Sequence, residues 1–231
     1  MAKFTPGALV GQISGSVGGT TFSHNRYGPY MRRRAVPVTS TTPAALAAKA
    51  ALAAGSTAWQ ALAAASKLAW NSWALTNPIT NSLGQTQTLT GHQAFTGLYA
   101  RALRAASPTL ELPPLEPAPA PLTSLTQTCD IGIGTFQLAF TPVPLAATEH
   151  LWIRAAVSDS IGIQYVENLL RFVYVSNPAL AAPFEHLNAL QLKFGTVAVG
   201  QIVYASVSVF SQTTKLLSPP LRDTTIVVET A

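Results

Sequence analysis

The feature that most constrains this fold is a proline-rich segment, SPTLELPPLEPAPAP, which runs from Ser107 to Pro121. Its six prolines remove backbone donors and favour an extended, polyproline-like path, so neither a helix nor a central strand continues through it. The pattern before this segment is helical from residue 43 onwards, and the pattern after it is that of short strands. The sequence therefore predicts a multidomain α+β chain in which residues 106–121 form a semi-rigid linker.

The charged residues divide at nearly the same place. Residues 1–104 contain nine Lys or Arg and no Asp or Glu, whereas residues 105–231 contain five basic and nine acidic residues, a net charge of −4. Only 10% of the chain is charged while 48% is hydrophobic, and a globular chain usually has about 25% charged residues. We therefore expect the chain to cover part of its surface against other subunits, with different neighbours for its two halves.

Residues 1–42 are rich in glycine and alternate apolar with small or polar residues, as in GQISGSV and TTFS. This pattern is typical of one or two hairpins and excludes a helix. Such hairpins are marginal in water on their own. We expect an extended docking arm or hairpin that lies against something else.

Residues 43–105 predict a small bundle of alanine-lined helices. Thr42 and Pro43 mark the start of the first helix, which we expect to end at Gly55, and another helix begins after Thr90. The helical spacing of the tryptophans favours a role in the core over a ligand platform. The expected apolar face consists of Trp59, Leu62, Ser66, Trp70 and Trp73, and it packs against Phe95, Leu98 and Tyr99.

Residues 122–231 predict a β-sandwich of the immunoglobulin or fibronectin type III kind. The expected strands are TFQLAF, HLWIRAAV, LRFVYVS, LQLKF, IVYASVSVFS and TTIVVET. The portion NPALAAPFEHLNALQL is less regular and is compatible with a helical turn. A sandwich of this length can bury its own core, so we expect it to be separable from the rest of the chain. The single cysteine, Cys129, is expected to be a buried, inert thiol.

The sequence contains no specific catalytic or cofactor motif. GxSxG, HExxH, GxxxxGK[ST] and CxxC are all absent, and the four histidines are dispersed. We therefore expect a protein that is not an enzyme and binds neither a cofactor nor a metal. No apolar run is long enough to predict a membrane span, and the first residues do not resemble a signal peptide.

The most specific feature of the basic half is its arginine cluster, Arg26, Arg32, Arg33 and Arg34, interleaved with Tyr27 and Tyr30. Residues 1–104 contain no carboxylate, so this cluster needs an anion from elsewhere. We favour docking to carboxylates of a neighbouring protein subunit. Contact with nucleic-acid phosphates is the alternative, and a solvated charge cluster is a third interpretation.

The order of three stretches resembles a family of structural proteins of tailed bacteriophages and prophages. These are SGSVGGTTFSHNRYGPYMRRRAVPVTSTTPAA, AWQALAAASKLAWNSWA and PITNSLGQTQTLTGHQAFTGL, and FGTVAVGQIVYASVSVFSQTTKLLSPPL resembles the fibronectin-like or immunoglobulin-like module often appended to that family. The resemblance implies an oligomeric virion component of the capsid, neck or tail, made in the host cytoplasm, with other virion proteins and copies of itself as partners.

Two other functions stay open at this point. One is a virion protein whose basic half contacts packaged DNA, with an affinity that falls steeply with salt. The other is an adhesin whose sandwich binds a host glycan. An adhesin needs solvent-facing aromatic side chains, for which Trp152 and Tyr165 are the candidates, although Trp152 is expected in the core.

Overall fold

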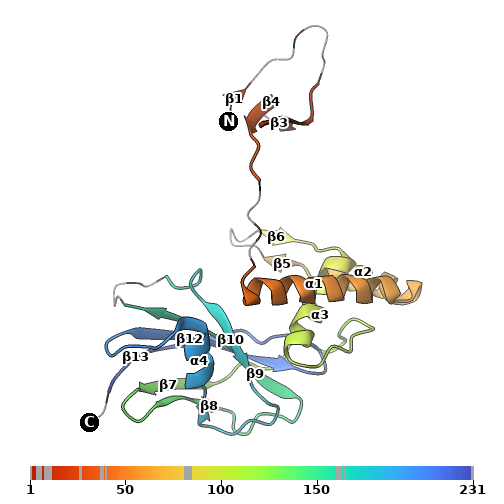
Figure 1. The fold of residues 1–231 in the computed structure, drawn as a ribbon. Coiled ribbons are helices and arrows are strands. Elements are labelled where there is room, and N and C mark those ends of the chain that lie inside the picture. The colour runs from red at the N-terminus through yellow and green to blue at the C-terminus, as the bar shows by residue number, and fades with distance from the viewer. Residues whose placement is uncertain are drawn as a thin grey trace. The chain divides into compact units, whose positions relative to one another are not determined.

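The computed structural model describes residues 2–3, 7, 12–25, 28–36, 39, 41–80, 85–159, 163 and 165–229. It is a mixed α+β structure that contains helices and several antiparallel sheets, as the sequence predicted (Figure 1). The chain divides into two compact units, Met1–Leu46 and Ala47–Ala231. Among the described residues, no helix is long and apolar enough to cross a membrane.

The first unit contains a four-stranded antiparallel sheet, here called the N-terminal sheet, with the strand order β1-β4-β3-β2. Its strands are β1 (Ala2–Lys3), β2 (Gly15–Val17), β3 (Thr20–Asn25) and β4 (Gly28–Arg33). The connection from β2 to β3 is a tight turn in which Gly18 has a φ of +56°, a conformation that glycine adopts without strain. The predicted hairpins are therefore present, and together they form one sheet.

Three helices follow, and we call them the helical layer: α1 (Pro43–Ala61), α2 (Ala64–Thr76) and α3 (Gly91–Arg104). The prediction that the first helix ends at Gly55 is wrong. Gly55 lies inside α1, where a Cβ atom would come within 3.0 Å of the side chain of Thr96. The glycine allows α1 and α3 to pack closely, and the chain breaks instead at residues 62–63. A short hairpin of β5 (Ile79–Thr80) and β6 (Thr86–Gln87) connects α2 to α3.

The predicted start of α3 after Thr90 is confirmed by its capping box. The Thr90 side chain accepts a hydrogen bond from the backbone of Gln93, and the Gln93 side chain accepts one from the backbone of Thr90. The predicted core role is also confirmed for Trp70, while Trp59 and Trp73 are half-buried against the same cluster. Trp70 is fully buried, and its ring packs edge-on against Phe95 with ring centroids 5.3 Å apart.

The remaining strands form two antiparallel sheets, here called the C-terminal sheets, with the orders β10-β9-β12-β13 and β11-β8-β7. The strands are β7 (Ser124–Asp130), β8 (Thr135–Thr141), β9 (Glu149–Ser158), β10 (Arg171–Val175), β11 (Phe184–Glu185), β12 (Ile202–Ser211) and β13 (Leu221–Ile226). Leu138 and Phe140 of one sheet share a core with Ile153 and Val207 of the other.

The segment LQLKF, predicted as a strand, belongs to the helix α4 (Leu187–Phe194). Leu187, Leu190 and Phe194 lie three and four residues apart, so in a helix they share one face. That face packs against Phe136 and Val203 of the C-terminal sheets. A buried strand would also have to cover Leu192, but Leu192 is exposed.

The helical layer and the C-terminal sheets belong to one compact unit, which differs from the predicted separation at the proline-rich linker. The end of α3 is the reason, because Ala105 packs with Trp152 of β9 and Phe210 of β12. Nearby, the buried Lys215 donates a hydrogen bond of 2.6 Å from Nζ to Oγ of Ser107. The sheet face opposite the core is therefore covered by helix at this end.

Candidate docking surface

The arginine run lies in the N-terminal sheet and on the residues that follow it. Arg32 pairs with Thr21 and Arg33 pairs with Thr20 of β3. The backbone N–H of Arg34 donates to the carbonyl of Gly19 at 2.8 Å, which continues the pairing beyond β4. All three side chains are exposed. Arg26, the fourth arginine of the predicted cluster, lies outside the described residues.

Strand geometry divides this run between two faces. Successive side chains of a strand point to opposite sides, so Arg33 lies on one face of the sheet while Arg32 and Arg34 lie on the other. Residues paired across strands share a face. Arg32 therefore lies with Thr21 and Ser16, on a face that is polar except for the ring of Tyr30. The sequence analysis treated the three arginines as one cluster, but the strand geometry divides them between two faces.

Arg33 shares its face with apolar residues, and we call this side the Arg33 face. Met31 and Phe22 are paired there, and Val17 lies on the same side through its pairing with Thr20. Met31 is 37% exposed and Val17 is 74% exposed. None of the described residues among 1–46 is buried. Since a sheet normally buries one face, we interpret the Arg33 face as the docking surface.

The N-terminal sheet also lacks any compensating negative charge. Residues 1–46 contain five Lys or Arg and no Asp or Glu. Among the described residues, both ion pairs involve Glu167, so neither includes an arginine of this sheet. An apolar face with an arginine in it can bind a protein surface that offers apolar side chains and a carboxylate.

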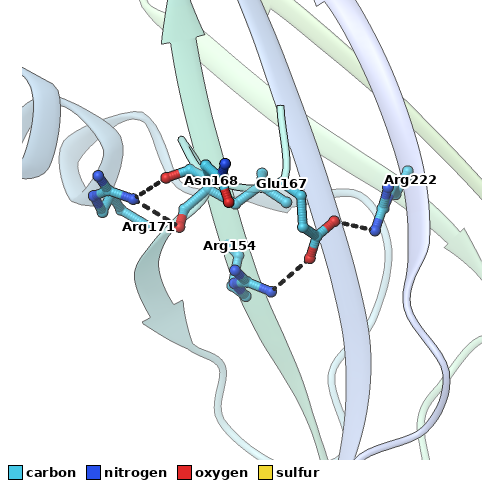
Figure 2. A network of polar contacts seen from close by, with 6 residues as sticks. Arg154, Glu167, Asn168, Arg171 and Arg222 are labelled. Carbon is cyan, nitrogen blue, oxygen red and sulfur yellow. Dashed lines mark hydrogen bonds and ion pairs between the residues drawn. The ribbon is translucent and has the colours of Figure 1, made fainter. Parts of the chain in front are cut away.

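A second polar cluster, which the sequence analysis missed, lies on the C-terminal sheets (Figure 2). Glu167 contacts Arg154 at 3.5 Å and also Arg222, and these arginines come from β9 and β13. Arg171 donates to the backbone carbonyl of Asn168 at 2.7 Å. These contacts fasten the segment before β10 to the outer face of the sheet. Because the residues lie far apart in sequence, only their pairing through the sheet could have revealed the cluster.

The C-terminal sheets contain a buried cysteine. Cys129 is buried, as expected, and burial raises the pKa of its thiol to about 11, so the thiol stays protonated at neutral pH. The described part of the chain contains no group of three or more His, Cys, Asp or Glu side chains arranged to hold a metal ion. The aromatic candidates for glycan binding differ, since Trp152 is buried and Tyr165 is exposed.

His186 makes the stability of this unit depend on pH. Its ring lies 4.3 Å from that of Phe136, measured between centroids, and neither ring nitrogen has a hydrogen-bond partner among the described residues. Burial lowers the pKa of His186 to about 4 from the ordinary 6.5. The folded state therefore disfavours the proton, and its stability is complete above pH 6.5 and falls as the pH drops toward 4.

We expect this loss to approach about 1.4 kcal/mol per pH unit between these two values. Chemical denaturation at a series of pH values measures this loss of stability. Comparison with His186→Leu controls for the other groups that titrate in the same range. In that variant the contribution is absent, so its curve is flatter between pH 6.5 and 4. Parallel curves for the two proteins would contradict the assignment to His186.

No family model matches the chain, and no curated protein matches it. Among solved structures, the chain is similar to an Fn3-like protein from Clostridium thermocellum, with 16% sequence identity and a TM-score of 0.31. That similarity covers 50% of this chain and 97% of the other.

Proposed function

We propose that the protein is a non-enzymatic virion structural protein of a tailed bacteriophage. It docks to other capsid, neck or tail subunits through its basic N-terminal half. Its two C-terminal sheets form a β-sandwich of the immunoglobulin or fibronectin type III kind, which is displayed outward. The bacteriophage assignment rests on the sequence resemblance described above.

The observation that carries the docking role is the N-terminal sheet itself. It has four strands, only positive charge and no buried residue among those described. A sheet of this size gains stability only when an apolar face is covered. An assembly protein supplies that cover from a neighbouring subunit.

Removing the arginines tests this role. We expect the combined replacement of Arg32, Arg33 and Arg34 by alanine to lower incorporation into particles by at least about tenfold, because the partner's carboxylates are left unpaired. The copy number per purified particle measures this, and the thermal unfolding of residues 47–231 should not change. A control removes a positive charge outside the basic N-terminal half, from the exposed Lys193.

The outcomes separate the rival functions. Normal incorporation of the triple variant would contradict docking through the arginines. Normal incorporation with lost retention of packaged DNA would favour the DNA-binding alternative. The adhesin alternative retains only Tyr165, which is 70% exposed, because the other aromatic candidate is buried.

A further inference from the structure

We propose that the occupant of the Arg33 face is a second copy of this chain, which contributes the acidic, leucine-bearing part of its proline-rich segment, residues 111–118. This inference rests on the proposed docking function and names one partner for it. The two surfaces are complementary in kind. One offers apolar side chains with an arginine, and the other offers exposed leucines with two glutamates.

The carboxylates of the chain narrow the choice of partner surface. Of the nine Asp and Glu residues, six have side chains engaged within their own chain. These are Asp130, Glu149, Asp159, Glu167, Glu185 and Asp223. Three remain, Glu111, Glu116 and Glu229, whose carboxylates have no such contact among the described residues. Glu111 and Glu116 lie together in the proline-rich segment, each next to an exposed leucine, so this segment is where a second copy offers two anions beside apolar side chains.

The same segment presents the most exposed leucine among the residues that the structure describes. Leu115 is 98% exposed and Leu112 is 60% exposed, each next to one of these glutamates. In a polyproline helix, which has three residues per turn, positions 112 and 115 lie on the same side. Exposed leucines at this spacing, flanked by acids, fit a shallow apolar face that contains a cation.

The segment is also held in place before any partner binds. Trp70 donates a hydrogen bond of 3.2 Å from Nε1 to the carbonyl of Glu111, and Leu122 is buried in the core of the C-terminal sheets. Between these anchors, every residue of 112–121 except Leu115 is a proline or precedes one, which restricts the backbone to extended conformations. Little conformational entropy is therefore lost when this segment binds.

Other arrangements of two copies fit less well. If two Arg33 faces met, each would bring Arg33 and no carboxylate, because residues 1–46 contain no Asp or Glu, so the contact would be repulsive. Addition of the proline-rich segment to a strand edge also fits poorly, because prolines lack the N–H that a sheet edge requires. The face of the sheet is therefore the better site.

Charge exchange between two copies tests the proposal. Sedimentation velocity of the full chain at low ionic strength should show reversible, concentration-dependent association that weakens as salt is added. Arg33→Glu and Glu116→Arg should each weaken this association by at least about tenfold, because each places like charges opposite one another. An equimolar mixture of these two variants should associate as tightly as the unchanged protein, since both contacts in the mixture are then complementary.

Matched variants exclude trivial explanations. Arg32→Glu makes the same change in charge on the opposite face and should weaken association much less than Arg33→Glu. Leu115→Ser should weaken association without altering charge. All four substitutions are at exposed positions, and tryptophan emission checks that each variant remains folded.

Three results would overturn the proposal. One is a chain that stays monomeric at every concentration. Another is equal weakening by Arg32→Glu and Arg33→Glu. The third is recovery of association when Arg33→Glu and Glu116→Arg are combined in one chain, without recovery when the two single variants are mixed. That result would identify the same chain's segment as the occupant. The proposed virion function is tested separately, by particle incorporation of the variant in which Arg32, Arg33 and Arg34 are replaced by alanine.

Discussion

Replacing Trp70 with alanine is expected to destabilise residues 47–231 by about 3–5 kcal/mol, a large fraction of the stability of a typical domain. Trp70 is fully buried between α2 and α3, packs edge-on against Phe95 and Trp73, and belongs to a cluster that includes Leu98. Its loss leaves a cavity that these already packed neighbours fill only in part. The hydrogen bond to the carbonyl of Glu111 is lost as well.

Urea denaturation measures the change in the free energy of unfolding. Leu75→Ala is the matched control, because Leu75 is in the same helix but 67% exposed, and its replacement should cost far less. The ring would not be part of the core if Trp70→Ala left the free energy of unfolding unchanged and the tryptophan emission of the unchanged protein were that of exposed rings.

The second large effect concerns the fragment 122–231. We expect it to be less stable than the fragment 47–231 by about 3–6 kcal/mol, because removing the helical layer uncovers Trp152 and Phe210, each of which gains about 1.5–3 kcal/mol from burial. Both rings pack with Ala105, which the shorter fragment lacks. The loss of Ser107 also leaves the buried Lys215 without its hydrogen-bond partner.

Thermal unfolding of the two fragments, followed by circular dichroism, tests this expectation. The variant Ala105→Asp in the longer fragment is a useful companion, since it disturbs the same contact without deleting a helix. Equal stability of the two fragments would support the separable domain that the sequence suggested. Aggregation of 122–231 alone would agree with an uncovered apolar face.

Much of the local structure could be predicted from the sequence because it depends on nearby residues. Thr90 and Gln93 define a helix start by themselves, and the alternation in IVYASVSVFS corresponds to the whole of β12. The strand β7 was missed because one of its inward positions carries the polar Gln127, so its alternating hydrophobic signal is weak. The predicted last strand overlaps β13 but lies a few residues too late.

The failures share one cause, which is contact between residues far apart in sequence. Gly55 looked like a helix end, and only the approach of Thr96 explains a glycine inside α1. The proline-rich segment indicated a domain boundary, but Ala105, which precedes it, packs with Trp152 and Phe210, which follow it. The arginine run of the candidate site was found, but its division between two faces follows from the pairing of Arg32 and Arg33 with β3.

The lack of a buried residue in the described part of 1–46 has a thermodynamic consequence. A partner that binds only the formed sheet stabilises it by mass action, by about 2.7 kcal/mol when the free partner is at a hundred times its dissociation constant. The sheet is then more stable in a crowded assembly than in dilute solution, with no change in its own sequence. Its amide protons should exchange more slowly as the subunit concentration rises, while those of β12 stay constant.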